Sequence, residues 1–296
     1  MLTKKQFNLL VFLTEQKQGI SQREVANKLN ISLGTVNKLF KELSSLGYVS
    51  NGAITQEGID LLENNYRVKH AILMAAGFGS RMVPITFNTP KPLVRVHGTR
   101  IIDTIIDGLI AAEVEEIYVV RGYLGEQFDQ LLYKYPNVKF INNPIYNTAN
   151  NIGSILQVGD LVRSSYVIEA DIYVSNPKIF TKYQYSSNYL AIPVKRTDDY
   201  CLYVEDGVIK STGLGGVDCY QQVGISYWTD NDGKKIAGYI QDVFNSPGGK
   251  ERFWGSIPLS THKHEFVVGI RECAMEDVKE IDSFQELKEI DPSYNV

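Results

Sequence analysis

The stretch AILMAAGFGSRMVPITFNTPKPLV, residues 71–94, decides how this chain folds. It begins with a short apolar run, which predicts a buried β-strand, and continues into a loop that contains Gly77 and Gly79. Glycines leave room for the backbone to approach phosphate oxygens, and successive amide N–H groups can then bind those oxygens. Arg81 and Lys91 follow the glycines and add two cations that suit a phosphate ligand. The stretch therefore predicts a strand followed by a nucleotide-binding loop.

The glycine pattern alone is weak evidence, because ordinary turns also contain Gly-x-Gly. It is not a Walker A loop, since no Gly-Lys-Ser/Thr follows, and it is not a dinucleotide-binding fingerprint, since the third glycine is missing. The pattern gains force from its context, which is a strand before the loop and Thr89-Pro90-Lys91-Pro92-Leu93 after it. We therefore expect the loop backbone to contact a nucleoside triphosphate through Ala75, Ala76, Gly77 and Gly79.

The composition is that of an ordinary globular protein. The 296 residues are 44% apolar and 22% charged, and they suggest one large domain or two unequal ones. A formal net charge of −4 argues against a protein dominated by nucleic-acid contacts but allows a locally basic face. Cys201, Cys219 and Cys273 show no CxxC spacing, which argues against a zinc site or a disulfide framework and fits a reducing cytoplasm. With no signal peptide and no apolar stretch of membrane-spanning length, we expect a cytoplasmic protein without a membrane partner.

Residues 1–66 carry the pattern of short helices followed by a small hairpin. Ser21 is an expected N-cap with Glu24 at the capping-box position, and Ser32 can cap the next helix. Asn51-Gly52, between two short apolar segments, predicts a β-hairpin. Helix, turn, capped helix and hairpin together predict a winged helix-turn-helix domain.

The stretch SQREVANKLNISLGTVNKLFKELSSLGYV, residues 21–49, resembles the DNA-binding domains of bacterial transcriptional regulators. If this domain binds DNA, one of its helices faces the major groove. The polar residues expected on that helix are Ser32, Thr35, Asn37, Lys38 and Lys41. Lys and Arg exceed Asp and Glu only slightly here, so a module that serves only dimerisation or regulation is an open alternative.

Beyond Tyr66 the pattern changes to strands that alternate with helices. The expected strands are His70–Met74, Ile117–Val120, Val138–Ile141 and Tyr166–Glu169, and the expected helices are Ile101–Ala112, Glu126–Tyr135 and Ile152–Val162. Such spacing implies parallel βαβ units in a three-layer α/β sandwich. The part from Tyr189 on is richer in strands and turns, and it could extend the sheet. We therefore expect a second, α/β domain over residues 67–296.

The combination of strand, glycine loop and Thr-Pro-Lys-Pro-Leu resembles the nucleotidyltransferases that activate sugar phosphates and phospho-alcohols. Further stretches look like the bacterial CTP:phosphocholine cytidylyltransferases of the choline-incorporation pathway. These stretches are VVRGYLGEQFDQL, NNPIYNTANNIGSIL, SYVIEADIYV, GISYWTD and VKEIDSFQEL. The resemblance runs from about Lys69 almost to the C-terminus and implies a Rossmann-like mixed sheet that is mostly parallel. Members of this family usually lack a winged helix, so the N-terminal domain is a departure.

Carboxylates stand where a metal ion would be expected. Glu169-Ala170-Asp171 follows an apolar strand, and ligands of open α/β sheets bind at the carboxyl ends of strands. The resemblance implies that Asp171 and Asp282 bind Mg²⁺, a hard cation that prefers oxygen ligands. A turn or helix cap is the alternative for Asp171, and Asp282-Ser283 could simply cap the last helix. Glu169 alternates with Asp171 along the chain, so it could support the metal or contact a cationic acceptor.

The resemblance also suggests residues for the base and for the acceptor. Contacts to cytosine are expected from Gly122, Tyr123, Asn150, Asn151 and Ser154, although the asparagine pair could equally be a polar turn before a helix. An ammonium group would be held by aromatic faces and carboxylates. The expected acceptor-binding residues are Glu169, Tyr173, Tyr200, Trp228 and Trp254, with ordinary core positions as the alternative for each tryptophan. Lys195 follows a strand and could bind the acceptor phosphate.

The implied reaction is an in-line attack by the phosphate oxygen of phosphocholine on the α-phosphorus of CTP, which gives CDP-choline and pyrophosphate. A phosphate monoester is already ionised near neutral pH, so catalysis reduces to positioning and charge stabilisation by Mg²⁺, Lys91 and Arg81. Phosphoethanolamine, 2-aminoethylphosphonate or a sugar 1-phosphate are alternative acceptors. An alternative of another class is a transcriptional regulator whose transferase-like domain only senses a nucleotide. Whether the chain forms a homodimer is left open by the sequence.

Overall fold

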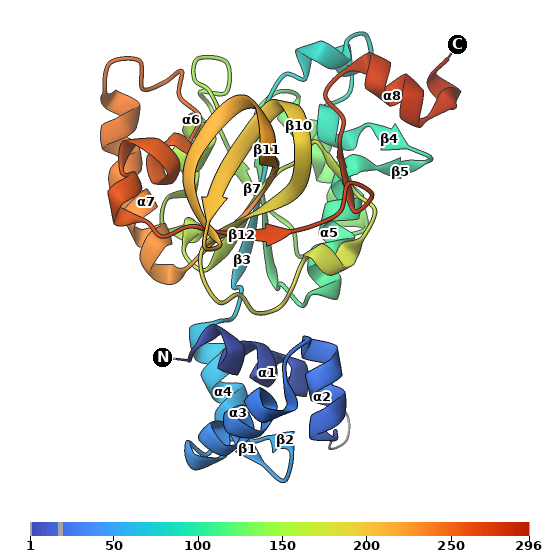
Figure 1. The fold of residues 1–296 in the computed structure, drawn as a ribbon. Helices are drawn as coiled ribbons and strands as arrows, with labels where there is room; N and C mark the ends of the chain where they lie inside the picture. Colours follow the sequence, from blue (N-terminus) through green and yellow to red (C-terminus); the bar gives the residue numbers. More distant parts are fainter. Residues whose placement is uncertain (1, 17–19, 296) are drawn as a thin grey trace. The chain divides into compact units, whose positions relative to one another are not determined.

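The computed structural model describes residues 2–16 and 20–295 (Figure 1). The chain divides into two compact units, one formed by Met1–Arg67 with Tyr183–Tyr185, the other by Val68–Lys182 with Ser186–Val296. Within the described residues, no helix is both long enough and apolar enough to pass through a membrane.

The first unit is a winged helix. Its elements are α1 (Lys4–Thr14), α2 (Gln22–Leu29), α3 (Leu33–Ser45), β1 (Val49–Ser50), β2 (Ala53–Ile54) and α4 (Gln56–Asn65). The predicted capping box is present, because the Ser21 hydroxyl accepts from the Glu24 amide and the Glu24 carboxylate accepts from the Ser21 amide. Asn51 and Gly52 both have positive φ and join the antiparallel pair β1–β2, as the hairpin signal predicts.

The core of the first unit includes residues from a distant part of the chain. Leu9, Leu10 and Leu43 are fully buried in its centre. Tyr183 and Tyr185 belong to the same apolar cluster, although in sequence they lie between the two stretches that form the second unit. The Tyr185 ring lies 5.4 Å from Phe7 and 6.0 Å from Tyr66. Its hydroxyl donates a hydrogen bond of 2.9 Å to the carbonyl oxygen of Leu2.

The second unit is built on a seven-stranded sheet with the order β10-β12-β11-β8-β3-β6-β7. Its strands are β3 (His70–Ala75), β6 (Glu116–Arg121), β7 (Lys139–Asn142), β8 (Ser165–Glu169), β10 (Asn188–Glu205), β11 (Val208–Trp228) and β12 (Gly269–Glu272). β3 pairs in parallel with β6 and β8, and β6 pairs in parallel with β7. β11 is antiparallel to β8 and β10, so the sheet is mixed but mostly parallel.

Helices cover both faces of this sheet (Figure 1). They are α5 (Ile101–Ala111) on one face and α6 (Ile152–Val158) and α7 (Asp230–Asn245) on the other, whereas α8 (Phe284–Ile290) packs in a separate apolar cluster with Met82 and Ile281. Side chains alternate along β3, so Leu73 packs in one core cluster with Ile105 of α5, whereas Ile72 packs in another with Ile155 of α6 and Ile240 of α7. A strand buried on both faces reads as a continuous apolar run, which confirms the three-layer α/β prediction.

Shorter elements complete the second unit. They are the pairs β4 (Arg95–Val96) with β5 (Thr99–Arg100) and β9 (Ile172–Val174) with β13 (Val278–Glu280), and the short helical turns η1 (Ser80–Met82), η2 (Ile85–Phe87), η3 (Lys91–Leu93), η4 (Gly125–Tyr133), η5 (Gly159–Val162), η6 (Pro177–Ile179), η7 (Ile257–Thr261), η8 (Lys263–Glu265) and η9 (Pro292–Tyr294).

Two predicted helices differ in the structure. Residues 125–133 form the 3₁₀-helix η4 in place of an α-helix, and its two buried residues, Phe128 and Leu131, are three positions apart. That spacing matches the three-residue repeat of a 3₁₀-helix but also fits an α-helix, so the sequence does not separate them. The predicted helix over residues 152–162 is α-helical only to Val158, because Gly159 takes a positive φ and a 3₁₀ turn follows.

Candidate active site

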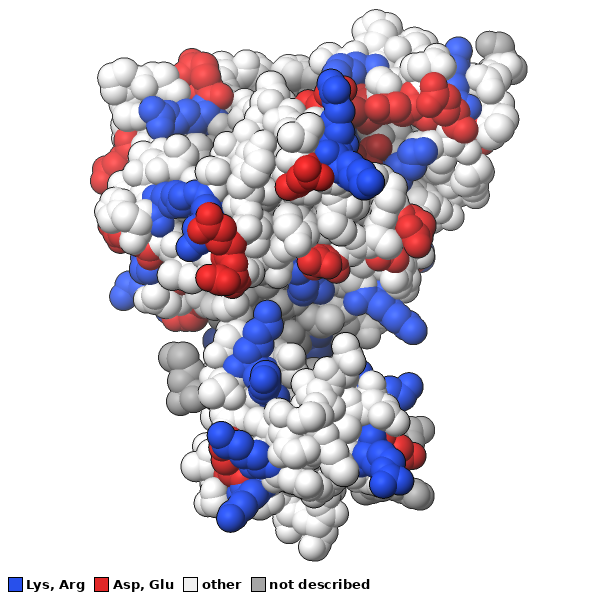
Figure 2. All heavy atoms as spheres, in the orientation of Figure 1, with Lys and Arg blue, Asp and Glu red and all other residues white. Residues whose placement is uncertain are grey.

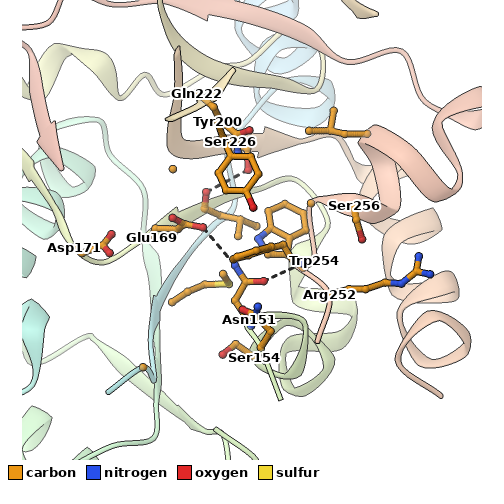
Figure 3. A pocket seen from close by; sticks show the side chains of 18 of the residues that line it. Asn151, Ser154, Glu169, Asp171, Tyr200, Gln222, Ser226, Arg252, Trp254 and Ser256 are labelled. Atoms are coloured by element: carbon orange, nitrogen blue, oxygen red, sulfur yellow. Dashed lines mark hydrogen bonds between the residues drawn. The ribbon is translucent and has the colours of Figure 1, made fainter. Parts of the chain in front are cut away.

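A cavity of about 870 Å³ opens beside the carboxyl ends of β3 and β8, a volume that suits small-molecule ligands. Its walls come from the glycine loop, the start of α6, the end of β8, the β10–β11 arm (residues 188–228) and residues 252–260, and the C-terminal segment closes one side. Figure 3 shows the side chains on these walls. The charged residues among them are Arg81, Glu169, Asp171, Asp199, Arg252, Glu280 and Asp282.

Lys91 forms ion pairs with two aspartates that are far apart in the sequence. The turn η3 buries Lys91, and its Nζ lies 2.8 Å from Asp171 Oδ2 and 2.9 Å from Asp282 Oδ1. Arg81 Nη2 lies 2.8 Å from the same oxygen of Asp282. Burial opposes the charge on Lys91, but the charge of Asp171 and the hydrogen bonds to both aspartates outweigh it and raise the pKa of the amine. The lysine therefore remains a cation in the site.

Strand pairing brings the C-terminal segment to Asp171. β13 runs antiparallel to β9 with Glu280 opposite Ile172, and the Ile281 amide donates to the Asp171 carbonyl oxygen. Ser283, and not Asp282, caps α8, because the Ser283 hydroxyl accepts from the Glu286 amide. Capping therefore leaves the Asp282 carboxylate available to Lys91 and Arg81.

Three carboxylates gather at one point of the cavity. Glu169, Asp171 and Glu280 each offer an oxygen, and these oxygens lie within 4.8 Å of one another. Burial and the charge of Asp171 raise the pKa of Glu169 to about 7. Partial enclosure and the charges of Asp171 and Asp282 raise the pKa of Glu280 to about 8.

This cluster fits a divalent cation. Asp171 Oδ1 is buried and has no hydrogen-bond partner among the described residues. A buried carboxylate oxygen without a partner, next to carboxylates that repel one another, is what a bound cation would stabilise. The sequence-based prediction named Asp171 and Asp282 but not Glu280. A signal for Glu280 was present, because it stands two residues before Asp282 at the end of a short strand.

Some residues predicted to bind the nucleotide line the cavity, and others do not. Ala76, Gly77, Asn150, Asn151 and Ser154 line it. The Asn151 amide bridges two walls, because its Nδ2 donates to Glu169 Oε1 at 3.4 Å and its Oδ1 accepts from the Trp254 amide at 2.9 Å (Figure 3). Asn150 serves the turn before α6, where its Oδ1 accepts from the Asn151 amide.

The other residues predicted to bind the nucleotide do not line this cavity. Ala75 is a core residue of β3 and does not line the cavity. Gly79 stands behind the cavity wall with a φ of 62°, and a Cβ there would lie 3.0 Å from Lys91 Cβ, so this close approach requires glycine. Gly122 is needed because a Cβ would lie 2.6 Å from the Tyr146 side chain, and Tyr123 points to the glycine loop rather than into the cavity.

Of the residues predicted to bind the acceptor, some line the cavity and others do not. Glu169, Tyr200 and Trp254 line the cavity. The prediction for Trp228 is wrong: its side chain is 0% exposed in the core, and its Nε1 donates to Ser226 Oγ at 2.9 Å. Tyr173 packs against the separate apolar cluster that contains Ile281 and Met82, not against the cavity. Lys195 is exposed on β10 and lies outside the cavity wall.

Comparison with known proteins places this site in a family. The Nucleotidyl transferase family model matches residues 70–192. The 2-aminoethylphosphonate cytidylyltransferase of Lancefieldella rimae is 37% identical over 235 residues, which are 78% of this chain and 95% of that protein. The chain belongs to the cytidylyltransferases. The choline-phosphate cytidylyltransferase of Streptococcus pneumoniae is 30% identical over 222 residues, which are 75% of this chain and 96% of that protein.

A solved structure agrees with the cytidylyltransferase fold described above. The CTP:phosphocholine cytidylyltransferase from Streptococcus pneumoniae is 31% identical in sequence, with a TM-score of 0.70 over 77% of this chain and 99% of that one. Both curated relatives are thus covered almost end to end by about three quarters of this cytidylyltransferase.

The first unit of this cytidylyltransferase matches a different family model, Winged helix-turn-helix DNA-binding, over residues 2–50. α3 buries one side and leaves Asn37, Lys38 and Lys41 exposed, whereas Thr35 is half-buried. The Thr35 hydroxyl lies 2.8 Å from Ser32 Oγ at the start of this helix. Figure 2 shows more Lys and Arg than Asp and Glu on the visible face of this unit.

Proposed function

We propose that this protein transfers a cytidylyl group from CTP to a small amine that carries a phosphoryl or phosphonyl group, with 2-aminoethylphosphonate as the preferred acceptor. The observation that carries this proposal is the convergence of Lys91, Arg81 and the carboxylates of Asp171, Glu280 and Asp282 beside the glycine loop. Cations for a triphosphate and oxygen ligands for a metal ion then adjoin the same cavity, with room beside them for an acceptor.

In the proposed reaction, an oxygen of the acceptor attacks the α-phosphorus of CTP and forms a new P–O bond. The bond to the β-phosphate breaks, and pyrophosphate leaves with the electron pair. The attacking group is already an anion, so the protein's task is orientation and charge stabilisation. Lys91 is held rigidly by two carboxylates, and Arg81 is exposed enough to follow the departing phosphates.

We propose that Asp171, with Glu169 and Glu280, binds Mg²⁺, and that Asp282 instead orients Lys91 and Arg81. When bound, the ion would neutralise triphosphate charge and polarise the α-phosphate.

The three free cysteines suit the reducing cytoplasm, where we place this activity.

The lining of the cavity supports a primary amine as the acceptor group. A primary ammonium group donates hydrogen bonds, and the carboxylate of Asp199 and the side-chain amide oxygen of Gln222 are acceptors on the walls. A trimethylammonium group instead needs aromatic faces, and two aromatic residues expected for that purpose, Trp228 and Tyr173, are elsewhere. The 37% identity to a 2-aminoethylphosphonate enzyme, against 30% to a choline-phosphate enzyme, supports the same choice.

Phosphocholine is the second candidate acceptor. Tyr200 and Phe253 form an edge-to-face pair at 5.7 Å, both rings are about half exposed, and both line the cavity. These two rings provide aromatic surface to which a quaternary ammonium group could bind.

A matrix of substrates tests these proposals. Purified full-length protein with MgCl₂ is given each of CTP, UTP, ATP and GTP with 2-aminoethylphosphonate, phosphoethanolamine, phosphocholine or glucose 1-phosphate, and pyrophosphate release is measured. We expect the highest kcat/KM with CTP and 2-aminoethylphosphonate, and the nucleotide product is verified by mass. A higher kcat/KM with phosphocholine would establish the second candidate, whereas no release with CTP and any of the amines would overturn the proposal.

We also propose that the winged-helix unit binds DNA through α3. Support comes from the exposed polar face of this helix and from the match to a DNA-binding family model. A gel-shift assay with the promoter region of its own gene, with and without CTP, is the test. Lys41→Ala should weaken binding, while Lys234→Ala, an exposed lysine of α7, should not. No shift under any condition would remove DNA binding from the function.

A further inference from the structure

The glycine loop, residues 76–90 between β3 and Lys91, is long, and most of its internal hydrogen bonds join residues only three positions apart. Within the loop, Thr86 Oγ1 donates to the Gly79 carbonyl oxygen at 2.8 Å, and the short turns η1 and η2 add local bonds. Phe87 and Val83 are exposed apolar residues of this loop. A loop of this kind loses much conformational freedom when it closes on a nucleotide, unless other parts of the protein order it beforehand.

Burial of Met82 in the apolar cluster with Ile281 and Leu287 provides part of that order, and a short segment after β6 provides more. The Tyr123 amide donates to the Ala76 carbonyl oxygen at 3.1 Å, at the start of the loop. The Tyr123 hydroxyl lies 3.0 Å from the Thr86 carbonyl oxygen and 3.2 Å from that of Phe87, at the far end of the loop. One residue therefore binds both ends of the glycine loop.

The next turn of the same segment adds a further bond. Gln127 Nε2 donates to the Asn88 carbonyl oxygen at 2.8 Å, immediately before the Thr-Pro-Lys segment that carries Lys91. Side-chain donors thus lie within hydrogen-bond distance of three consecutive carbonyl groups of the loop, from Thr86 to Asn88.

Ring contacts extend this support to the cavity wall. Phe78, the residue between the two loop glycines, lies 5.2 Å from the Tyr123 ring and 5.3 Å from the Tyr146 ring. Tyr146 lines the cavity and packs over Gly122 so closely that any side chain there would collide with it. The three rings connect the glycine loop, the segment after β6 and the segment before α6.

We propose that Tyr123 is a positioning residue that holds the glycine loop in the conformation that binds the triphosphate, and that it acts through the loop backbone rather than on the base. This inference rests on the proposed use of CTP. It assigns to Tyr123 a part in CTP affinity, in contrast to the base contact expected from the sequence. Because the phosphates are common to all nucleoside triphosphates, its loss must weaken CTP and UTP binding to the same degree.

The test uses Tyr123→Phe in the full-length protein. This change keeps the ring beside Phe78 and removes only the hydroxyl that contacts the two carbonyl groups. We expect KM for CTP to rise about 3- to 10-fold, the effect of a lost hydrogen bond, with kcat within about 2-fold of the wild-type value. Amide hydrogen exchange in residues 77–89 should accelerate, and the apparent melting temperature should change little.

Two further variants sharpen the outcome. Gln127→Ala should produce the same pattern, because it removes the neighbouring bond to the loop. Tyr133→Phe removes a hydroxyl from a tyrosine that is 96% exposed and should match the wild type in every assay. An unchanged KM for CTP with unchanged exchange in Tyr123→Phe would overturn the proposal. So would a changed ratio of CTP to UTP affinity, because that result would mean that Tyr123 contacts the base.

The proposal can fail separately from the proposed function. Hydrogen exchange of the loop and CTP affinity measured by calorimetry need no acceptor, so an incorrect acceptor leaves both measurements valid. If wild-type protein binds no CTP, the proposed function fails, whereas faster exchange in residues 77–89 of Tyr123→Phe would still show that Tyr123 orders the loop.

Discussion

Lys91 is buried between two carboxylates that come from segments far apart in the sequence. Its amine is 2.8 Å from Asp171 and 2.9 Å from Asp282, so it is held at one position rather than sampling many. A rigid cation beside the transferring phosphate should act mainly in the transition state. We therefore expect Lys91→Ala to lower kcat by about 100- to 1000-fold with a much smaller effect on KM for CTP, as measured by single-turnover kinetics.

Lys195→Ala is the matched control, because this lysine is exposed and lies outside the cavity wall. Its kcat should stay within about 2-fold of the wild-type value, since surface substitutions away from a site have small effects. Normal turnover in Lys91→Ala would remove Lys91 from the mechanism, and a severe loss in Lys195→Ala would show that the β10–β11 arm closes over the site.

The carboxylates beside Lys91 predict a dependence of stability on pH and on metal. Burial and neighbouring charge raise the pKa of Glu169 to about 7 and that of Glu280 to about 8. Above about pH 5 the unfolded chain has already released these protons, whereas the folded protein still holds them. In EDTA, the free energy of unfolding should therefore fall as the pH rises from about 5 to about 8. Urea unfolding at both pH values measures this fall, and Mg²⁺ should oppose it at pH 8.

Glu280→Gln removes one of the two raised titrations and one of the proposed oxygen ligands of Mg²⁺. Its stability in EDTA should fall less with pH, and its activity should need about 10-fold more Mg²⁺ for half-saturation. Glu276→Gln, on the exposed turn before β13, should behave as the wild type does. If Glu280→Gln has the wild-type pH profile and the wild-type Mg²⁺ requirement, Glu280 belongs to neither the titrating cluster nor the metal site.

At the scale of elements, the sequence predicted the features that depend only on residues close together in the chain. The alternation of strands and helices, the Ser21 capping box and the Asn51-Gly52 hairpin follow from spacing over a few residues. The long β10–β11 arm could not be predicted in this way, because its path depends on bulges and on pairing between residues far apart in sequence. The same limit explains why Trp228 was expected in the acceptor site. Its burial depends on which face of β11 packs against the helices, and the amino-acid composition does not determine that face.

The two tryptophans therefore make a contrasting pair. Trp228→Phe removes volume and a buried hydrogen bond to Ser226, so it should lower the free energy of unfolding by about 1–3 kcal/mol and leave the acceptor KM unchanged. Trp254 packs on Trp228 at 5.6 Å but also lines the cavity, so Trp254→Phe should lower the free energy of unfolding and, unlike Trp228→Phe, also raise the acceptor KM. Denaturant unfolding and acceptor titrations on both variants decide the assignment. A change of acceptor KM in Trp228→Phe alone would restore the sequence-based expectation.

At the scale of the whole molecule, each motif of the site could be found in the sequence, but the sequence did not predict how these motifs come together in space. Lys91, Asp171 and Asp282 each stand in a recognisable local context, but the register of β13 on β9 is what adds Glu280 to them. Tyr183–Tyr185 is the clearest case of a contact that no local pattern predicts. These residues lie in the middle of the α/β unit's sequence, between β9 and β10, yet they complete the core of the winged-helix unit. Such contacts depend on the path of the chain, which periodicity does not encode.

The winged-helix unit should therefore depend on a segment that lies outside its own stretch of sequence. Tyr185 contributes ring contacts to Phe7 and Tyr66 and a hydrogen bond to Leu2. In the full-length protein, Tyr185→Ala should destabilise this unit by about 2–4 kcal/mol, the usual cost of truncating a packed aromatic residue, and so accelerate hydrogen exchange in α1 and α4. Tyr133→Ala, at an exposed tyrosine, should not. Cytidylyl transfer should continue in Tyr185→Ala, because its cavity is lined by the other unit. Loss of both properties together would mean that the two units unfold as one.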